Sequence, residues 1–428
     1  MKKILITFIL LPILYSCSSS HIKLTQRGLN HYFESNFYKN QFVGFELYDV
    51  KDNKVVYQYQ SDKYFTPASN TKIFTLYTGL HILPNQLPAL QYEEKNDTLY
   101  IEGTGDPSFL HPFFKDSTTI NFLKSKNEPI TIYLDNFKDN AFGPGWSWGD
   151  YQYYYSPERS AFPIYGNIIA AYVQQNTPKT FPNYFKNNIS LDTIPYHRDQ
   201  FQNKFHISKT QNDTIEIPFI TDESTLKNVL QDTIHLPVSI THKPLSGQKK
   251  YLYSIPSDSL YKRMMHVSDN FFAEQVLLMS SGILSHDTLK TSIAQNYILK
   301  HELEDIRQKP RWVDGSGLSR YNLFTPHSFV QVLAKLYKEI PQERLFNIFA
   351  VGGVSGTLKN SYKSNTTKPY IYAKTGSLSN NHNISGYLIT DSGKVLIFSY
   401  MNNHYMQSST NIKKQMEQLL LTIKKYYK

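Results

Sequence analysis

A serine and a lysine three residues apart, Ser69 and Lys72, stand where an apolar run begins in TPASNTKIFTLYTGL. On a helix this spacing places both side chains on one face, so that the amine can take the hydroxyl proton. The transfer needs a neutral lysine, and burial lowers a lysine pKa in that direction. Because the run IFTLYTGLHIL predicts a buried helix, Ser69 is a candidate nucleophile and Lys72 is its candidate base.

The Ser-x-x-Lys spacing alone is not specific. A capping serine beside a surface charge is the alternative interpretation, and the same spacing occurs elsewhere in the chain, at Ser20/Lys23, Ser224/Lys227, Ser246/Lys249 and Ser259/Lys262. Ser69 therefore needs further motifs to distinguish it from these pairs.

Two short motifs later in the chain supply candidate partners. Ser268-Asp269-Asn270 interrupts a long helical pattern, so that a hydroxyl and an amide two residues apart can both face a cleft. Lys374-Thr375-Gly376 stands at the end of a β-like run, where glycine lets a substrate backbone lie close and lysine supplies charge for a carboxylate. Neither motif is specific alone, because Ser379-Asn380-Asn381 is another Ser-x-Asn and Lys-Thr-Gly is also compatible with an ordinary turn.

The elements that must position these residues come from both ends of the chain. Residues 41–60 alternate apolar and polar around an Asp-Asn turn, and residues 383–403 do so around Asp-Ser-Gly, so each segment predicts a β-hairpin. A final helix is predicted from one apolar face, formed by Ile412, Met416, Leu419, Leu420 and Ile423. The hairpins and helices predict one layered α/β domain built from residues 17–84 and 251–428.

Residues 85–250 have a different texture. Short β-like runs such as DTLYIEG, ITIYLDN and TIEIPFI are separated by Pro, Gly and Asn-Asp turns. We expect a β-rich insertion between the Ser-x-x-Lys and Ser-Asp-Asn motifs.

The three motifs in this order resemble the signature of penicillin-binding proteins and serine β-lactamases. The chain more narrowly resembles the S13 family of D-alanyl-D-alanine carboxypeptidases/endopeptidases, the penicillin-binding protein 4 type. The resemblance covers nearly all of the chain after its N-terminal segment. It is carried by GTGDPSF (103–109), GPGWSWGD (143–150), SDNFFAEQ (268–275), DGSGLSRYN (314–322), GVSGTLKN (353–360) and AKTGSLSN (373–380).

The resemblance implies a fold, an α/β (α+β) domain of the serine β-lactamase/DD-peptidase type with an antiparallel sheet flanked by helices. It also implies that Ser69 attacks the carbonyl between two D-alanines of a peptidoglycan stem peptide, with Lys72 as base, and that β-lactams inhibit the enzyme. Ser268 and Lys374 would relay a proton, and Asn270 would position Lys72 and the substrate amide. Thr375 with Lys374 would bind the terminal carboxylate, and Gly376 would let the substrate lie close. The amides of Ser69 and Ser377 would form the oxyanion hole.

The family also has a subsite for the free end of a diaminopimelate side chain. Its acid matches Asp150, its arginine matches Arg320, and its aromatic wall matches Tyr155. The alternative is that Trp146 and Trp148 are core residues and that Asp150 caps a loop. The insertion is short for the family, which leaves the number of its subdomains open.

The N-terminal segment MKKILITFILLPILYSC predicts an export signal over residues 1–16. Two lysines precede an apolar run from Ile4 to Leu14 that is too short for a permanent membrane span. Cys17, the single cysteine, follows Leu-Tyr-Ser, which resembles a bacterial lipobox; a stray thiol near an ordinary cleavage site is the alternative. We expect an exported periplasmic lipoprotein, anchored through Cys17 to a membrane, the outer membrane where the organism has one.

Charge and histidine spacing bound the remaining possibilities. The net charge is +10, but the basic residues are spread along the chain, and export argues against a nucleic-acid partner. Histidines such as His235, His242 and His266 lack the spacing of zinc ligands. We therefore expect no metal and no cofactor.

Three hypotheses follow. The first is a serine D-Ala-D-Ala carboxypeptidase/endopeptidase that works through an acyl-enzyme on Ser69. A serine β-lactamase shares the three motifs, but we would not expect it to carry the diaminopimelate-type subsite or the long insertion. A non-catalytic wall-binding lipoprotein is the third, and it would be expected to have lost the nucleophile, the lysine or Lys-Thr-Gly, all of which this chain keeps.

Overall fold

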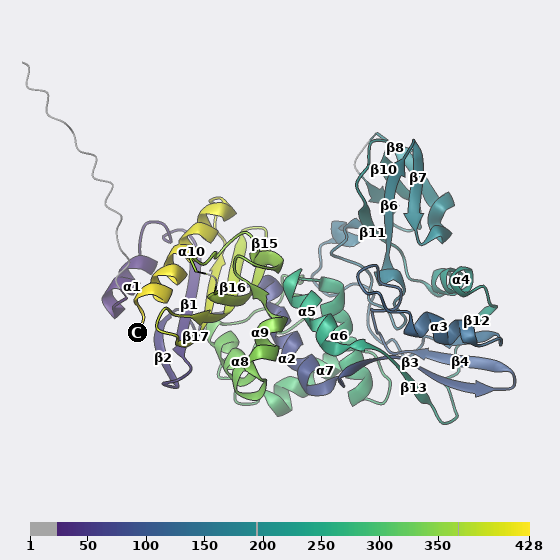
Figure 1. The fold of residues 1–428 in the computed structure, drawn as a ribbon, viewed down its shortest axis with the longest axis horizontal. Helices are drawn as coiled ribbons and strands as arrows, with labels where there is room; N and C mark the ends of the chain where they lie inside the picture. Colours follow the sequence, from purple (N-terminus) through teal and green to yellow (C-terminus); the bar gives the residue numbers. More distant parts are fainter. Residues whose placement is uncertain (1–23, 194–195, 367) are drawn as a thin grey trace, which may run out of the picture.

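A six-stranded antiparallel sheet forms the core of one half of the computed structural model, which describes residues 24–193, 196–366 and 368–428 (Figure 1). The first two strands of the chain lie beside the last, because β1 pairs with β17 along its whole length. Both predicted hairpins are confirmed, as β1–β2 and β16–β17. In sheet order the strands are β14 (Ala350–Val351), β15 (Ile371–Leu378), β16 (Asn381–Ile389), β17 (Val395–Asn403), β1 (Phe42–Asp49) and β2 (Lys54–Tyr59).

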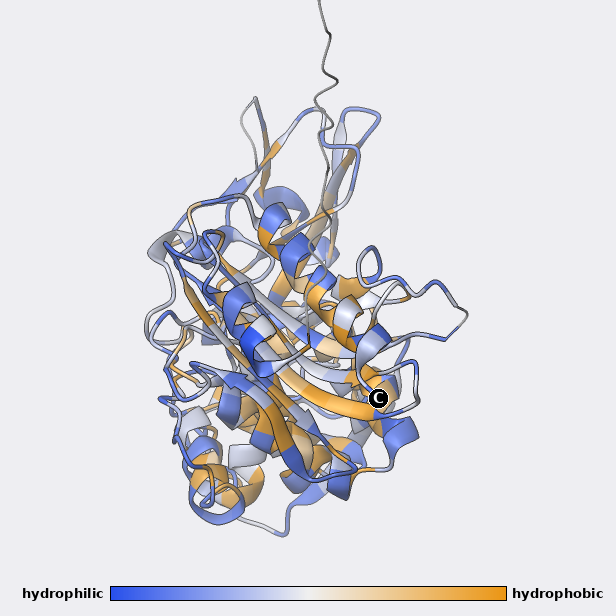
Figure 2. Cartoon of the chain, turned by 90° about the vertical axis from the view of Figure 1, so that its left-hand side faces the viewer, coloured by the Kyte–Doolittle hydropathy of each residue, from blue (hydrophilic) through white to orange (hydrophobic). Residues whose placement is uncertain are grey.

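Two terminal helices, α1 (Gln26–Phe33) and α10 (Ser409–Tyr426), cover one face of this sheet. The predicted apolar face of the last helix is confirmed, since Ile412, Met416, Leu419, Leu420 and Ile423 are all fully buried. They pack with strand residues in one apolar cluster. Figure 2 looks at the molecule from this side and shows hydrophilic residues on the helices in front of largely hydrophobic strands.

The other face carries the helices that hold the Ser-x-x-Lys and Ser-Asp-Asn motifs. Helix α2 (Lys72–Ile82) is central: every residue from Lys72 to Gly79 is buried, which confirms the predicted buried helix. It packs against α6 (Asn270–Leu284) and α8 (Pro326–Glu339). The remaining helices of this layer are α5 (Ser257–His266), α7 (Thr291–Tyr297) and α9 (Gln342–Ile348), with a π-helical turn at Ile298–Glu302.

The segment between the first two motifs lies beside this layered body and is rich in strands, as expected (Figure 1). Its largest sheet has the order β12-β5-β4-β3-β13, and β13 returns along β3 just before α5. The strands of this sheet are β3 (Gln86–Lys95), β4 (Thr98–Gly103), β5 (Ile130–Tyr133), β12 (Val238–Thr241) and β13 (Lys250–Pro256). Two helices that the sequence did not predict, α3 (Thr118–Ser125) and α4 (Glu223–Ile234), join its core.

Two three-stranded sheets complete this segment. One has the order β11-β6-β7, from β11 (Ile215–Pro218), β6 (Ile168–Gln174) and β7 (Thr177–Phe181). The other has the order β8-β10-β9, from β8 (Ile189–Asp192), β10 (Phe205–Ser208) and β9 (His197–Arg198). The division of the chain into domains stays a prediction.

The predicted export signal and Cys17 lie outside the described residues. Among the residues that are described, no helix is both long and apolar enough to cross a membrane.

Candidate active site

Ser69 lies in a 3₁₀ turn, η1 (Ala68–Thr71), which runs directly into α2. Two glycines let other segments approach this turn closely. A Cβ on Gly376 of β15 would lie 2.9 Å from the Ser69 amide nitrogen, and a Cβ on Gly317 would lie 1.9 Å from the Ala68 carbonyl oxygen. Gly317 also has a φ of +82°. The Lys-Thr-Gly and Asp-Gly-Ser-Gly motifs therefore pack against the turn of the candidate nucleophile from two sides.

The Lys72 ammonium is fully buried and makes three polar contacts. Its Nζ lies 3.0 Å from Ser69 Oγ, 2.6 Å from Asn270 Oδ1 and 2.6 Å from the Ser316 carbonyl oxygen. The Asn270 amide is oriented by its Nδ2, which donates to the Tyr155 carbonyl oxygen at 2.9 Å. In contrast, the lysine of the Ser259/Lys262 pair is exposed. The structure thus separates the Ser69 pair from this other Ser-x-x-Lys match.

These three contacts define what a neutral Lys72 amine can do. A neutral amine has two N–H donors and one lone pair, and carbonyl oxygens can only accept. Asn270 and Ser316 take both hydrogens, so the lone pair faces Ser69 Oγ and can accept its proton. Burial lowers the Lys72 pKa to about 8, against the opposing charges of Asp314, Glu274 and Asp269. A substantial fraction of the amine is therefore neutral near pH 8.

The second lysine, Lys374, is also fully buried. Its Nζ donates to Ser268 Oγ at 2.8 Å and to the Thr375 carbonyl oxygen at 2.6 Å. Burial, and then the charge of Lys72, hold the Lys374 pKa well below its ordinary value. Ser268 adopts a left-handed conformation, with φ +64°, in the break between α5 and α6. The predicted break at Ser-Asp-Asn is confirmed.

One detail of the prediction for Lys-Thr-Gly was wrong. The motif does not end a strand but lies in the middle of β15, which continues to Leu378 and pairs with β16 throughout. The sequence was interpreted as a β-like run that ends at this motif, with Gly376 allowing a substrate backbone to lie close. The strand instead uses that glycine to pass against η1.

Two buried carboxylates behind Lys72 carry no predicted role. Glu274 accepts a hydrogen bond from the Ser316 amide at 2.7 Å and forms an ion pair with Arg159 at 3.4 Å. Burial, and then the charge of Asp314, raise its pKa to about 7. Glu274 follows Asn270 by four residues on α6, so both face the same side of the helix. That spacing within SDNFFAEQ is the signal that could have identified it.

Asp314 holds the loop that supplies the Ser316 carbonyl. Its carboxylate accepts from the amides of Gly317 at 2.8 Å and Ser319 at 2.6 Å, and from Trp146 Nε1 at 2.8 Å. The Asp-Gly-Ser-Gly and Trp-x-Trp motifs therefore meet at one carboxylate. Trp146 is half-buried, but Trp148 is 76% exposed, so the interpretation of both as core residues was wrong.

A cavity of about 870 Å³ opens over Ser69. It brings together residues from η1, the α5–α6 break, β15, the 314–322 loop and the 143–155 segment, while Lys72 and Lys374 are buried. The predicted site residues that line it are Ser69, Ser268, Asn270, Thr375, Ser377, Asp150, Tyr155 and Arg320.

The predicted subsite residues lie along this cavity. Asp150, in η2 (Trp148–Gln152), accepts a hydrogen bond from the Tyr155 hydroxyl at 3.1 Å. Burial raises the Asp150 pKa, and the Tyr155 hydrogen bond and the positive charge of Arg320 oppose that shift. Burial also raises the pKa of Tyr155. Arg320 is exposed. An acidic and a basic side chain therefore both line this cavity.

Further side chains line the cavity, one of them within the GVSGTLKN motif, for which no role was predicted. Thr357 Oγ1 accepts from Thr375 Oγ1 at 2.8 Å. Glu216 of β11 and Arg263 of α5 add a second pair of opposite charges. Burial raises the Glu216 pKa, and the charge of Arg263 opposes this. Since these residues come from distant elements, only the tertiary fold places them together.

The comparisons with known proteins agree with this geometry. The sequence profile of the D-Ala-D-Ala carboxypeptidase 3 (S13) family matches residues 26–191 and 218–423. D-alanyl-D-alanine carboxypeptidase DacB of Haemophilus influenzae is 24% identical over 85% of this chain and 85% of its own. The crystal structure of penicillin-binding protein 4 (dacB) from that organism has the same fold, with a TM-score of 0.73 at 20% identity, over 91% of this chain and 97% of that chain. The same protein complexed with a β-lactam gives a TM-score of 0.70 at 19% identity over the same shares. The chain therefore belongs to the S13 family of serine D-Ala-D-Ala carboxypeptidases.

Proposed function

We propose that this carboxypeptidase hydrolyses peptidoglycan stem peptides through an acyl-enzyme on Ser69, with Lys72 as the general base. The observation that carries the proposal is the set of contacts around Lys72 Nζ: two acceptor oxygens at 2.6 Å and Ser69 Oγ at 3.0 Å. In this arrangement the neutral amine removes the Ser69 proton as Oγ attacks the carbonyl between two D-alanines. The D-alanine leaves as an amine, and water releases the acyl group.

The groups around Ser69 have separate roles in this proposal. Ser268 and Lys374 pass a proton to the leaving amine, supported by the 2.8 Å contact between Lys374 Nζ and Ser268 Oγ. The amides of Ser69 and Ser377 stabilise the oxyanion. Thr375, with Lys374, binds the terminal carboxylate, and Asn270 holds Lys72.

Asp150, Tyr155 and Arg320 are proposed to bind the amino and carboxylate end of a diaminopimelate side chain. The carboxylate of Asp150 pairs with the ligand's ammonium, and the guanidinium of Arg320 pairs with its carboxylate. A cavity of about 870 Å³ is large enough for more than a dipeptide, which supports endopeptidase action on crosslinked stems beside carboxypeptidase action.

Penicillin sensitivity and location are part of the same proposal. A relative of this fold has been crystallised with a β-lactam, and another relative, from Dictyostelium discoideum, is named a penicillin-sensitive carboxypeptidase. We propose that β-lactams acylate Ser69 here too. The mature protein would be an exported lipoprotein anchored at Cys17, with the catalytic domain in residues 17–84 and 251–428 and the insertion in residues 85–250.

The test is covalent labelling followed by product analysis. Wild-type protein and Ser69→Ala are incubated with a fluorescent penicillin, and then with D-Ala-D-Ala peptides and crosslinked muropeptides. We expect stable label on wild type only, with release of D-alanine, of monomers, or of both. Absence of label on wild type contradicts the catalytic proposal. Rapid turnover of penicillin without any peptide product would instead favour the β-lactamase hypothesis.

A further inference from the structure

Four side chains able to bind a metal share one face of the small sheet β8-β10-β9, away from the catalytic cavity. In the antiparallel pair, His206 of β10 stands directly opposite His197 of β9. Asp199 follows His197 by two residues, so it lies on the same side of the chain. Asp192, at the end of β8, pairs in register with Ser208, two residues from His206. The strand geometry therefore gathers these groups without any long-range motif.

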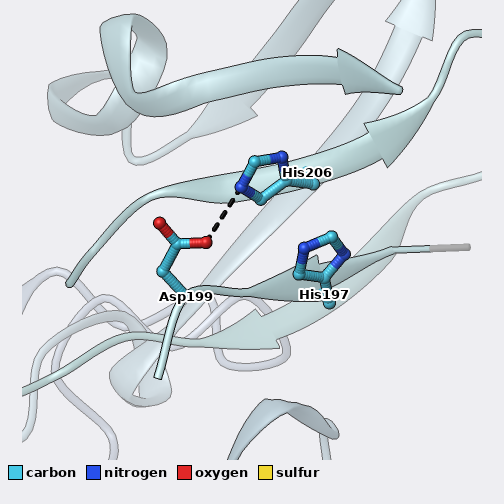
Figure 3. A group of neighbouring side chains, drawn as sticks. All are labelled: His197, Asp199 and His206. Carbon is cyan, nitrogen blue, oxygen red and sulfur yellow. Dashed lines mark hydrogen bonds and ion pairs between the residues drawn. The ribbon is translucent and has the colours of Figure 1, made fainter. Parts of the chain in front are cut away.

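The side chains already point toward one another, as Figure 3 shows for three of them. The imidazole rings of His197 and His206 are parallel, with centroids 4.3 Å apart, and His206 Nε2 lies 3.0 Å from Asp199 Oδ1. One donor atom from each of His197, Asp199 and His206 lies within 4.8 Å of the others. Asp192 Oδ2 lies 3.9 Å from His206 Nδ1.

The two faces of this sheet differ in chemistry. Phe205 and Ile207 of β10 alternate with His206 and are fully buried in an apolar cluster. Arg198, which stands between His197 and Asp199 in the sequence, is buried as well. His197, Asp199 and His206 are half-buried on the opposite face. The polar face is thus accessible to an ion from solvent, while its backbone is held by the core behind it.

We propose that His197, His206 and Asp199 form a binding site for a divalent transition metal, Zn²⁺ foremost, with Asp192 or water as the fourth ligand. Two imidazoles and a carboxylate are a ligand set that Zn²⁺ accepts, at bond lengths of about 2.0–2.2 Å. Donor atoms of one Zn²⁺ are therefore about 3–4 Å apart. Small side-chain rotations close the present spacing, without a shift of the strands. The expectation of no metal rested on spacing along the chain, which misses ligands paired across two strands.

The site would act as a cross-link within the insertion rather than in catalysis. β9 has two residues and β8 and β10 have four each, so few backbone hydrogen bonds hold this sheet. The chain leaves β9 through Gln200 and Phe201, which with Arg198 and Trp148 line an aromatic pocket of about 420 Å³. A metal that joins β9 to β10 fixes one wall of that pocket.

The test measures metal binding directly. Untagged, chelator-treated protein is titrated with Zn²⁺ by calorimetry and with Co²⁺ by visible absorption, and melting temperatures are recorded. We expect one tight Zn²⁺ per chain, an absorption band of low-coordinate Co²⁺ with nitrogen ligands, and a higher melting temperature with metal. His206→Gln and His197→Gln should each weaken Zn²⁺ binding by at least about 10-fold, because even the loss of a residue that only orients a metal ligand lowers affinity by about that factor.

A matched control is available in the second histidine–carboxylate group, Asp135, Glu223 and His242. His242 is 68% exposed, and His242→Gln should leave the tight site unchanged. Asp199→Asn, which keeps the shape of the side chain, gives a second variant if a histidine substitution disturbs the sheet. The proposal is overturned if no saturable binding occurs, or if binding persists in the His197, His206 and Asp199 variants. Penicillin labelling of Ser69 should be the same with and without metal.

Discussion

The pH dependence of acylation is the sharpest consequence of the contacts around Lys72. With a pKa of about 8, the neutral fraction of this amine is about 1% at pH 6, about 10% at pH 7 and about half at pH 8. If Lys72 removes the Ser69 proton, the second-order rate of acylation should rise about 50-fold between pH 6 and pH 8 and level off above about pH 9. The Lys374 pKa is also lowered, so a variant that changes the charge beside Lys72 is needed to assign the rise to Lys72.

The rate is measured by quenched labelling with a fluorescent penicillin, whose carboxylate stays ionised throughout the range. Glu274→Gln serves as the perturbed variant. The charge of Glu274 raises the Lys72 pKa, so its removal should move the midpoint of the profile to lower pH. Circular dichroism checks that the buried contact with Arg159 is not needed for folding. A rate that is flat from pH 6 to pH 9, or that falls as Lys72 loses its proton, refutes Lys72 as the base.

Three substitutions test the rest of the geometry. Gly376→Ala places a Cβ 2.9 Å from the Ser69 amide nitrogen. Penicillin labelling should fall by about 100-fold, as expected if Ser69 is displaced by about 1 Å. Gly149→Ala is the control and should label normally, because a Cβ there meets nothing within 4 Å. Asp150→Asn should lower kcat/KM about 10-fold for peptides with a free diaminopimelate end, because their ammonium pairs with the Asp150 carboxylate. Penicillin has no such group, so its labelling of Ser69 should be unchanged. Equal losses for the peptide and for penicillin would contradict the subsite. Leu420→Ala, in the buried face of α10, should lower the free energy of unfolding by about 2–5 kcal/mol in a denaturant titration while the folded protein still labels, and a loss below about 1 kcal/mol would show that α10 is not part of the core.

Local patterns in the sequence were enough to predict both hairpins of the main sheet and the helices α2 and α10. The hairpins around residues 41–60 and 383–403 follow from alternation, and the buried face of α10 follows from helical periodicity. Ser69, Ser268 and Lys374 could be grouped because a motif order, rather than any one spacing, distinguishes them. The structure brings them into one cavity or directly beneath it.

What the sequence did not predict depends on contacts between distant segments. The carbonyl of Ser316 binds Lys72 only because Glu274 and Asp314 hold its loop, and no backbone carbonyl is identified by residue type. Lys-Thr-Gly continues as strand because β16 pairs with it, which local propensity does not reveal. The helices α3 and α4 were not predicted because short strand-like runs dominate the sequence of residues 85–250.

The two buried lysines differ in their surroundings, and this difference predicts how the leaving amine of the proposed reaction obtains its proton. Lys72 is near three carboxylates that oppose the effect of burial, so it can change its protonation state near pH 8. Burial and the charge of Lys72 act in the same direction on Lys374, and both lower its pKa. A substrate carboxylate placed beside Lys374 supplies the missing negative charge and raises the Lys374 pKa, since an opposite charge favours the protonated form.

Substrate binding should therefore take up a proton from solvent and hold it next to Ser268, from which the leaving D-alanine amine receives it. Calorimetric titration of Ser69→Ala with a D-Ala-D-Ala peptide, in buffers of different ionisation enthalpy, measures this uptake at about pH 8. We expect an uptake of up to about one proton per bound peptide. The uptake should be smaller when the peptide's terminal carboxylate is amidated. If binding is tight but no proton is taken up, then the bound carboxylate does not protonate Lys374, and this route for the proton is refuted.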